Sequence, residues 1–577
     1  MVDVTALREL VDAERQRFSV PGLAVAVVLD GDVLLCEGFG DRDVHGGEPM
    51  LADTHFPIAS DTKAFTAATL CLLADEGRLD LDAPVRHLVP WFEMHDAHAT
   101  ALVSTRDLLS HRTGLPRHDF LWYGETELSL EDFARRLRHL PLSRPLRQSW
   151  QYNNLCFNTA GYLIEVLTGQ SWADAVRDLL LTPAGMTATV FDAHDPSIKA
   201  IAAPYKTVGD GVERQHLPER SKVGPAGGIV SSVEDLASWL QVRLGERPQV
   251  LSQDALAELH APAMVGGVAA ATAFDERQPM GYALGCQVES YRGRRIVRHG
   301  GNLVGYSSDV CVVPGAGIGI AVLANLHGTA LRDALPLAIV DRLLELTPTP
   351  WGERYHALMT AGLRGKEDAS EHHHENASRR PPSRDLEDFT GVYEHPAYGT
   401  FTIETDGQRL IPNFHGLGAL HELRHRDYDA WDLFLVEFDQ TLPLVFVQGS
   451  NGAISSLSVA LEPLVDPICF PRAAPAASDD LIDAMVGTYT SGPLSLVIRR
   501  RGSDVVALLP GAGSLVLTSA GGTRFTSRDI TTLSFEAQHG PDHAVTAMVI
   551  DPIGIFQRED DPHANPEQLA HAARSSS

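Results

Sequence analysis

The chain changes character once, near Thr347, and this change most constrains its fold. Before it, β-rich runs and helical patterns are mixed; after it, short alternating strands with Gly or Asp turns dominate. Between them lies a Pro-rich and then charged stretch that includes GKEDASEHHHENASRRPPSRD, a composition typical of linkers. The 577 residues therefore predict a first domain at 1–345, a linker at 346–384 and β domains beyond it.

The first 345 residues predict a single α+β domain. GLAVAVVLDGDVLLCEGFG, from Gly22 to Gly40, has two β-rich runs around the turn signal Asp30-Gly31-Asp32 and indicates a hairpin. RIVRHGG, YSSDVCVVPG and IGIAVLAN predict strands near the other end. Helical patterns lie between them and after them, at about 62–76, 104–111, 155–168, 231–244 and 330–346. Strands from both ends of the segment are expected to close one sheet.

The second half contains two β-rich blocks, at 385–470 and 480–560. They begin alike, because GVY with Gly391 and Tyr393 is matched by GTY with Gly487 and Tyr489. Two related antiparallel barrels or sandwiches are predicted. The remaining residues, 561–577, are expected to form a flexible tail.

Charge and composition restrict the partners. A formal net charge of −28 opposes binding to nucleic acid or anionic membranes. The start resembles an amphipathic helix rather than a signal peptide, and no run of 18 apolar residues suggests a membrane span. The six cysteines are scattered and are expected to be buried free thiols. We expect a cytoplasmic protein with a small-molecule or short-peptide substrate and no cofactor; the sequence leaves a homodimer open.

Lys63 is the first candidate catalytic residue. It follows Ser60 by three positions in FPIASDTKAFTAATLCLLADEGRLDL, at the start of an apolar helix, in a chain that has only five lysines. Residues i and i+3 share a helix face, burial lowers the pKa of a lysine, and arginine cannot act as a base. Ser60 and Lys63 are therefore a plausible nucleophile and activating base. An isolated Ser-x-x-Lys is also compatible with a lysine on a helix surface.

Two further patterns carry polar groups suited to catalysis. Tyr152-Asn153-Asn154 precedes a helix that begins near Leu155, and His299-Gly300-Gly301 ends a predicted strand. Tyr152 could transfer a proton, and the two glycines would let a substrate approach the strand edge. The alternative for the first is a helix-capping turn with a packed tyrosine. The alternative for the second is a tight turn between strands.

The three patterns, in this order, resemble those of the penicillin-recognising serine hydrolases. This beta-lactamase family includes class C beta-lactamases, D-aminopeptidases, DD-peptidases and related esterases. LLSHRTGLP, AGGIVSSVEDLASWL and YALGCQV resemble it too, and the resemblance covers about residues 10–345. It implies that Ser60 forms an acyl-enzyme, that Tyr152 carries protons to the leaving group and that Asn154 positions the substrate amide. Either Lys63 or Tyr152 would be the general base.

The resemblance also assigns roles around the third motif. His299 stands where beta-lactamases and DD-peptidases usually have the lysine of Lys-Thr-Gly, followed here by Gly300 and Gly301. The backbone N–H groups of Ser60 and Asn302 would form the oxyanion hole. A histidine is neutral for much of the time near pH 7, so this departure disfavours β-lactam or acyl-D-Ala-D-Ala substrates.

The expected activity is therefore that of the D-aminopeptidase-like or esterase-like members. A catalytic domain followed by two similar β-barrels resembles the D-aminopeptidase architecture, in which a loop of the last barrel reaches the active site. LPGAGSLVL and TSAGGTRF, within 509–525, are candidates for that loop. Hydrolysis of peptides or amides with an N-terminal D-residue is the first expectation, and a carboxylesterase or a weak beta-lactamase is the alternative.

Other classes of function are also compatible with the sequence. The five residues from His421 to His425 match H-E-x-x-H, a zinc motif that works on a helix and would make the chain a metallohydrolase. The surrounding sequence is β-rich, however, and four residues of a strand span roughly 13 Å, which is too far for both histidines to bind one zinc ion. His372, His373 and His374 of the linker could bind a metal weakly. A non-catalytic binding protein on the same fold is the third class. The chain has no Gly-x-Ser-x-Gly, which disfavours an α/β-hydrolase.

Overall fold

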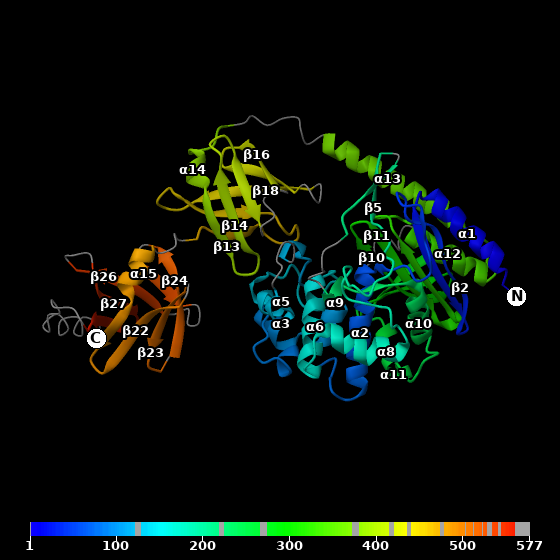
Figure 1. The fold of residues 1–577 in the computed structure, drawn as a ribbon, viewed down its shortest axis with the longest axis horizontal. Helices are drawn as coiled ribbons and strands as arrows, with labels where there is room; N and C mark the ends of the chain where they lie inside the picture. Colours follow the sequence, from blue (N-terminus) through cyan, green and yellow to red (C-terminus); the bar gives the residue numbers. More distant parts are fainter. Residues whose placement is uncertain are drawn as a thin grey trace.

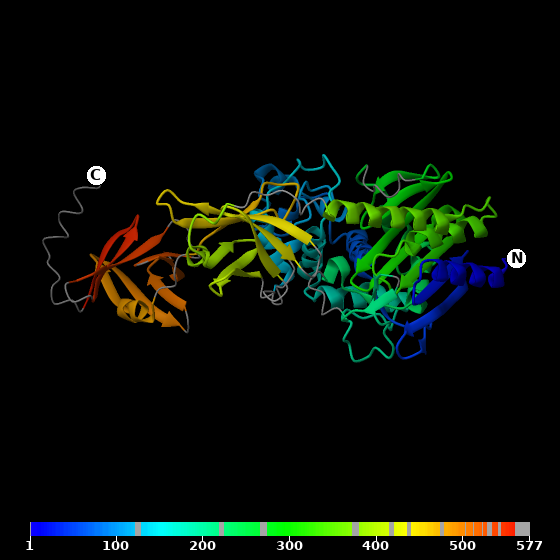
Figure 2. The ribbon, with the colours of Figure 1, turned by 90° about the horizontal axis from the view of Figure 1, so that it is seen from above.

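The chain folds into three units that follow one another along the longest axis of the molecule (Figures 1 and 2). The computed structural model describes residues 2–121, 128–209, 211–217, 224–265, 274–371, 380–414, 421–435, 440–473, 478–501, 504–511, 513–521, 523–527, 533–540 and 544–559. His372, His373 and His374 lie outside the described residues.

The first domain is built on one antiparallel sheet of eight strands in the order β3-β2-β1-β12-β11-β10-β9-β8. Strand β1 pairs with β12 in the interior of this open sheet, so strands from both ends of the domain join in one sheet, as the sequence predicts. In chain order these strands are β1 Gly22–Leu29, β2 Asp32–Asp43, β3 Glu48–Pro49, β8 Arg277–Tyr282, β9 Gln287–Tyr291, β10 Arg294–Leu303, β11 Tyr306–Val313 and β12 Ile318–Ala324.

Both faces of this sheet are covered, which explains the uninterrupted apolar run of β1. Successive strand residues point to opposite faces. Ala24 and Ala26 join the core beneath the larger group of helices, whereas Val25 and Val27 join the core on the other face. Helices α1 Val4–Arg17 and α12 Leu331–Leu343 pack on that second face.

A larger group of helices covers the face that carries the catalytic motifs (Figure 1). Its longest members are α2 Thr62–Asp75, α6 Asn154–Thr168 and α10 Val233–Arg243. The shorter helices of this domain are η1 Ala59–Asp61, η2 Val85–His87, α3 Ala97–Leu102, α4 Thr105–Leu109, η3 Asp119–Leu121, α5 Leu130–Arg136, η4 Leu137–His139, α7 Trp172–Val176, η5 Arg177–Leu181, α8 Thr182–Ala184, α9 Gly224–Gly227, α11 Gln253–His260 and η7 Pro314–Ala316. Two small two-stranded sheets pair β4 Phe56–Pro57 with β7 Val230–Ser231 and β5 Tyr205–Val208 with β6 Gly211–Arg214.

The stretch 346–384, expected to be a linker, contains helix α13 Trp351–Glu371. This part of the expectation is wrong. Trp351 and Tyr355, one helical turn apart, are buried in the first domain, and α13 packs against α12. Pro350 lies just before the helix, where its missing N–H and fixed φ do no harm.

The second and third units are both antiparallel β domains. The second begins with α14 Leu386–Phe389 and has two sheets, β13-β14-β15 and β16-β17-β18-β19-β20; the third begins with α15 Asp479–Met485 and closes as the barrel β21–β28. The strands are β13 Gly391–His395, β14 Gly399–Thr405, β15 Leu410–Phe414, β16 His421–Asp427, β17 Ala430–Leu435, β18 Gln440–Gln448, β19 Ile454–Val459, β20 Ile468–Pro471, β21 Gly487–Ser491, β22 Leu494–Arg501, β23 Asp504–Leu509, β24 Gly513–Gly521, β25 Arg524–Ser527, β26 Ser534–His539, β27 Val545–Asp551 and β28 Gly554–Arg558.

The similar starts of the two β domains correspond to one repeated structural feature. The hydroxyl of Tyr393 donates to the carbonyl of Phe389 at 2.8 Å, and that of Tyr489 donates to the carbonyl of Met485 at 2.7 Å. An arginine from the end of each domain, Arg472 or Arg558, lies about 6 Å from the corresponding ring centroid: 6.0 Å and 5.9 Å. The repeat therefore reflects one shared way of tying the first strand to the last.

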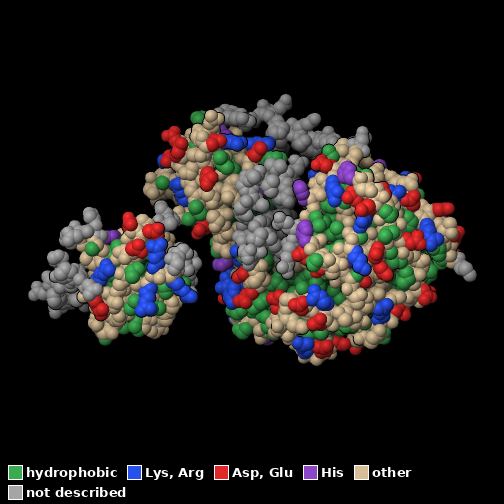
Figure 3. All heavy atoms as spheres, in the orientation of Figure 1, with side chains coloured by type: hydrophobic (Ala, Val, Ile, Leu, Met, Phe, Trp, Pro, Cys, Tyr) green, Lys and Arg blue, Asp and Glu red, His purple; other side chains and the backbone are tan. Residues whose placement is uncertain are grey.

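The surface and the cysteines complete the comparison with the sequence. Acidic and basic side chains are interspersed over the visible face of the molecule (Figure 3). Among the described helices, none has the length and apolar character needed to cross a membrane. The six cysteines are free; four are buried, but Cys36 is only partly buried and Cys469 is exposed, contrary to the expectation for these two.

Candidate active site

Ser60 lies on a strained turn at the start of a buried helix. It is the middle residue of η1 and leads directly into α2. Ala59 before it has φ +47°, a left-handed conformation that a residue with a side chain seldom adopts. The turn is held by the short β4–β7 pair and by the N–H of Ile58, which donates to the carbonyl of Ile229 at 3.0 Å. Backbone strain of this kind persists where surrounding contacts fix it, and it is common at active sites.

Lys63 is fully buried and in contact with Ser60. Its Nζ lies 3.0 Å from Ser60 Oγ, 2.9 Å from Asn154 Oδ1 and 2.7 Å from the carbonyl oxygen of Ala226. Burial, followed by the charge of Arg117, holds the pKa of Lys63 well below its ordinary value. The surface-lysine alternative is thus excluded by the geometry.

These three contacts orient a neutral Lys63. The carbonyl of Ala226 can only accept, and Asn154 presents its oxygen because its Nδ2 donates to Asp119 Oδ1 at 3.1 Å. The two N–H bonds of a neutral amine would therefore go to Asn154 and Ala226. The remaining lone pair faces Ser60 and can accept the hydroxyl proton.

Tyr152 also contacts Ser60. Its hydroxyl donates to Ser60 Oγ at 2.8 Å, and desolvation of the phenol raises the pKa of Tyr152 above its ordinary value. Tyr152 is therefore protonated at neutral pH and can supply a proton. The predicted helix-capping turn is also present, because the side chain of Asn153 caps α6 by accepting from the N–H of Cys156 at 2.8 Å.

His299 lies in β10 near Tyr152, with the two ring centroids 6.2 Å apart. Its Nδ1 is 2.9 Å from the carbonyl oxygen of Gly300, which can only accept, so Nδ1 carries the proton. Burial, followed by the charge of Lys63, lowers the pKa of His299 to about 3. His299 Nε2 is buried, and among the described residues it has no hydrogen-bond partner. The site therefore contains a neutral acceptor at this position.

Strand β10 extends past the glycines to Leu303, so His299-Gly300-Gly301 neither ends the strand nor forms a turn, contrary to expectation. Gly301 is needed for close packing, because a Cβ there would meet the carbonyl oxygen of Ile58 and Ser308 Oγ, each at 2.2 Å. The backbone at Gly301 consequently runs beside the turn that carries Ser60. The Asn302 side chain accepts from Ser307 Oγ at 3.0 Å.

Several residues at this site were missed by sequence reasoning. Asp119 and Arg117 form an ion pair at 2.6 Å, and the Arg117 guanidinium lies 4.9 Å from the Tyr152 ring centroid. Asp61, next to Ser60 in the chain, is buried and in contact with Ser308. The adjacent LLSHRTGLP motif could have drawn attention to Arg117 and Asp119, but no sequence signal connects Asp61 with Ser308.

The other sequence candidates lie away from this chemistry. His421 and His425 are on strand β16, four residues apart, too far for both to ligate one zinc ion, and His425 Nε2 contacts the Tyr428 carbonyl at 2.9 Å. Within the described part of the chain, no cluster of three His, Cys, Asp or Glu is placed to hold a metal. The segments within 509–525 form parts of β23, β24 and β25 and their turns in the barrel, with Ala512 and Gly522 outside the described residues.

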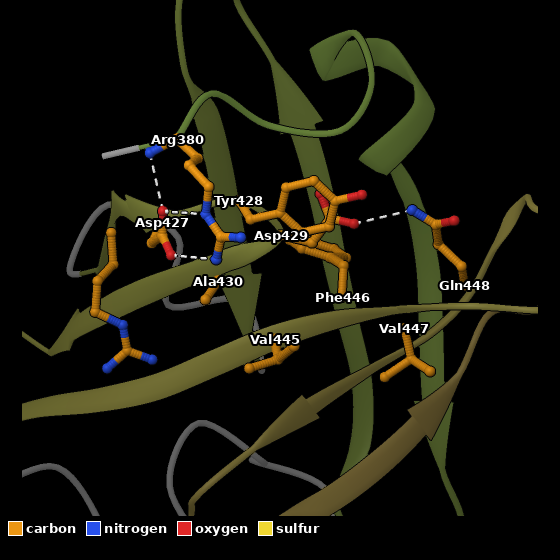
Figure 4. A pocket seen from close by; sticks show the side chains of 10 residues that line it. Arg380, Asp427, Tyr428, Asp429, Ala430, Val445, Phe446, Val447 and Gln448 are labelled. Atoms are coloured by element: carbon orange, nitrogen blue, oxygen red, sulfur yellow. Dashed lines mark hydrogen bonds and ion pairs between the residues drawn. The ribbon is translucent and has the colours of Figure 1, made fainter. Parts of the chain in front are cut away.

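A surface hollow in the second domain is a separate candidate site (Figure 4). Arg380 pairs with Asp427 at 2.7 Å, and Gln448 donates to Asp429 at 3.0 Å. The dashed lines in Figure 4 show these groups satisfying one another. The hollow contains no arrangement of nucleophile and base, and the catalytic motifs all lie in the first domain.

Comparison with known protein families identifies the family of the first domain. The Beta-lactamase family model matches residues 7–343. The chain belongs to the beta-lactamase family. This family of serine hydrolases accounts for the order of the three motifs and for the antiparallel sheet with its helices. A second model, a domain of unknown function called DUF3471, matches residues 375–470, the second domain of this beta-lactamase-family protein.

Individual relatives agree with the family assignment. An unguisins hydrolase of Aspergillus campestris is 30% identical over 480 residues, covering 79% of this chain and 89% of its own. Protein flp of Staphylococcus aureus is 27% identical over 320 residues, covering 55% of this chain and 62% of its own. The octameric penicillin-binding protein homologue of Pyrococcus abyssi shares the fold, with a TM-score of 0.53 and 22% identity, over 81% of this chain and 100% of its own.

Proposed function

We propose that this beta-lactamase-family hydrolase cleaves small amides through an acyl-Ser60 intermediate, and that its preferred substrates are peptides or amides with an N-terminal D-residue. The observation that carries the substrate class is His299, which is buried, neutral and offers an acceptor, Nε2. A neutral acceptor suits a substrate N–H. It gives no charge attraction to the carboxylate of a β-lactam or an acyl-D-Ala-D-Ala peptide.

The acylation step assigns each proton to a group in contact with Ser60. Lys63 Nζ takes the hydroxyl proton of Ser60 as Oγ forms a bond to the substrate carbonyl carbon. The backbone N–H groups of Ser60 and Asn302 stabilise the oxyanion. Tyr152 then donates its proton to the departing amine as the C–N bond breaks, and Lys63 returns a proton to Tyr152. In deacylation, a water molecule loses a proton to the same pair as its oxygen bonds to the acyl carbon. The bond from that carbon to Ser60 Oγ then breaks, and Oγ takes the proton back from the pair as the carboxylic acid leaves.

The Aspergillus relative supports hydrolysis as the reaction class. Its name states that it hydrolyses unguisins, and the similarity covers 79% of this chain, which reaches into the β domains. Because a neutral site also accepts uncharged esters, carboxylesterase activity is the second candidate, followed by weak beta-lactamase activity.

A chromogenic panel tests this proposal. It contains the p-nitroanilides of D-alanine and L-alanine, p-nitrophenyl butyrate and a chromogenic cephalosporin, assayed with the wild type and with Ser60→Ala. We expect turnover of the D-anilide above the L-anilide, little cephalosporin hydrolysis and no turnover by Ser60→Ala. Ester turnover alone would assign the esterase function. Activity that survives in Ser60→Ala but is lost on chelation would contradict the serine mechanism and favour a metal site.

A further inference from the structure

The second domain contacts the chain segment that borders the active site. This segment, residues 111–121, connects α4 to the end of η3 and carries Arg117 and Asp119. Asp119 accepts from Asn154, the same amide that contacts Lys63. The charges of Arg117 and Asp119 both act on the pKa of Lys63, Arg117 lowering it and Asp119 raising it.

His118, between these two residues, is the point of contact. It is fully buried, and its N–H donates to Glu462 Oε2 of the second domain at 3.0 Å. Its Nδ1 lies 2.7 Å from the hydroxyl of Tyr398, also of the second domain. A further bond joins the same surfaces, from the Arg136 guanidinium of α5 to the carbonyl of Ala397 at 2.8 Å.

The polarity of the His118–Tyr398 bond follows from the other ring nitrogen. His118 Nε2 lies 3.4 Å from the carbonyl oxygen of Pro141, which can only accept, so Nε2 carries the proton. Nδ1 is then the acceptor and the Tyr398 hydroxyl is the donor. Burial lowers the pKa of His118 to about 4, so the ring is neutral at pH 7.

We propose that the second domain completes the active site, with Tyr398 and Glu462 as positioning residues that hold Arg117 and Asp119 beside Asn154 and Tyr152. The proposal rests on hydrolysis at Ser60 and is independent of which amide or ester is cleaved.

The backbone of His118 gives the reason why such support is needed. Its φ is +48°, in the left-handed region that a histidine seldom adopts. A strained residue persists where surrounding contacts hold it. Without the bonds from the second domain, His118 can relax, and the residues on both sides of it shift relative to α6.

Tyr393 provides a matched control for Tyr398. Both are fully buried tyrosines of the same hairpin, β13–β14, or its turn. The hydroxyl of Tyr393 bonds to Phe389 within the second domain, whereas that of Tyr398 bonds to His118 of the catalytic domain. Tyr393→Phe therefore removes a comparable hydrogen bond and leaves the contact between the domains intact.

The experiment compares Tyr398→Phe with Tyr393→Phe in the full-length chain. Amide hydrogen exchange over residues 111–121 is followed by mass spectrometry, and kcat/KM is measured on the panel substrate that is turned over fastest. We expect Tyr398→Phe to accelerate exchange in this segment roughly tenfold and to lower kcat/KM roughly fivefold or more. Tyr393→Phe should leave both within about twofold of wild type. Glu462→Ala should resemble Tyr398→Phe, and Glu462→Gln, which keeps an acceptor oxygen, should retain most activity.

Each outcome decides the proposal. It is overturned if Tyr398→Phe behaves as wild type, if both tyrosine variants change equally, or if exchange rises without a loss of kcat/KM. A loss of kcat/KM without faster exchange also overturns it, because positioning would then not be the cause. If no panel substrate is turned over, the proposed function fails, and the exchange measurement alone decides whether the second domain holds the segment.

Discussion

Asp61 Oδ2 lies 2.6 Å from Ser308 Oγ, just below the nucleophile turn. Ser308 has one hydroxyl proton, and the carbonyl oxygen of Ile58, 2.9 Å away, can only accept it. When that proton goes to Ile58, the short contact with Asp61 needs a proton on the carboxyl group. Burial, followed by the charge of Asp309, raises the pKa of Asp61 to about 8, in agreement with this geometry.

Asp61→Asn should therefore change how stability depends on pH. The folded pKa of about 8 exceeds the ordinary value of 3.8, so the carboxyl's contribution is fully present below about pH 4 and is lost as pH rises through 8. The amide N–H₂ of the variant donates to Ser308 at every pH. We expect the variant to gain on the order of 4 kcal/mol relative to wild type between pH 5 and pH 9, because the difference of one bound proton is worth about 1.4 kcal/mol per pH unit up to the folded pKa. Urea denaturation at pH 5 and pH 9 measures the free energy of unfolding of both proteins, with exposed Asp53→Asn as the control. If the stability of Asp61→Asn and of the wild type changed equally with pH, the raised pKa of Asp61 would be contradicted.

Lys63→Arg and Lys63→Met should show separately how Lys63 affects turnover and how it affects the free energy of unfolding. Both lack a neutral amine, so kcat should fall by roughly 10²–10⁴-fold. The pKa of Lys63 in the folded state is well below its ordinary value of 10.5. At pH values between the folded pKa and 10.5 the unfolded state therefore binds more protons than the folded state, and the stability of the wild type increases with pH. Lys63→Met lacks this increase, and its stability advantage over wild type should shrink as pH rises toward 10. Full activity of Lys63→Arg would rule out a neutral lysine as the base.

Gly301→Ala should disrupt the site far more than Gly300→Ala. A Cβ at Gly301 would overlap the backbone of Ile58, whereas at Gly300 the nearest atoms, in Arg332 and Ser308, are 3.3 Å away. We expect Gly301→Ala to cost about 1–3 kcal/mol of stability and to lower kcat/KM at least tenfold. Thermal unfolding and turnover of the panel substrate test this pair. Equal effects of the two substitutions would mean that the close approach of β10 to Ile58 is unimportant.

His299→Lys should disfavour substrates that bear an amine. His299 is buried and neutral, whereas a cationic lysine at this position would repel the ammonium group of a substrate that bears an amine. We expect kcat/KM for the D-alanine anilide to fall at least tenfold more than that for p-nitrophenyl butyrate. Exposed His327→Lys is the control for added charge. An unchanged ratio of the two substrates would remove His299 from substrate selection.

The sequence predicts most of the first domain because its signals are local. Strand β1 and helices α2 and α6 each have a regular apolar pattern, and Ser60, Lys63, Tyr152 and Asn154 lie in motifs at their ends. Helix α13 was missed because the prolines just before it and the charged residues toward its end resemble a linker. The i, i+4 pair Trp351 and Tyr355 was the contrary signal.

The supporting contacts of the site could not be predicted in the same way. The carbonyl of Ala226 contacts Lys63 from 163 residues away in the chain, and Ser308 contacts Asp61 across 247 residues. Backbone carbonyls occur at every position, and a serine in a strand carries no sign of its partner. Such contacts come from packing of distant segments and are visible only in the folded chain.

The tyrosine and arginine that tie the first strand to the last in each β domain have an evolutionary consequence. Tyr393 with Arg472, and Tyr489 with Arg558, each lie within a single domain. A duplicated stretch of gene that includes both partners encodes a module that closes on itself. Recombination can therefore add such modules at the end of a hydrolase gene, or delete the last one, without opening the core of those that remain.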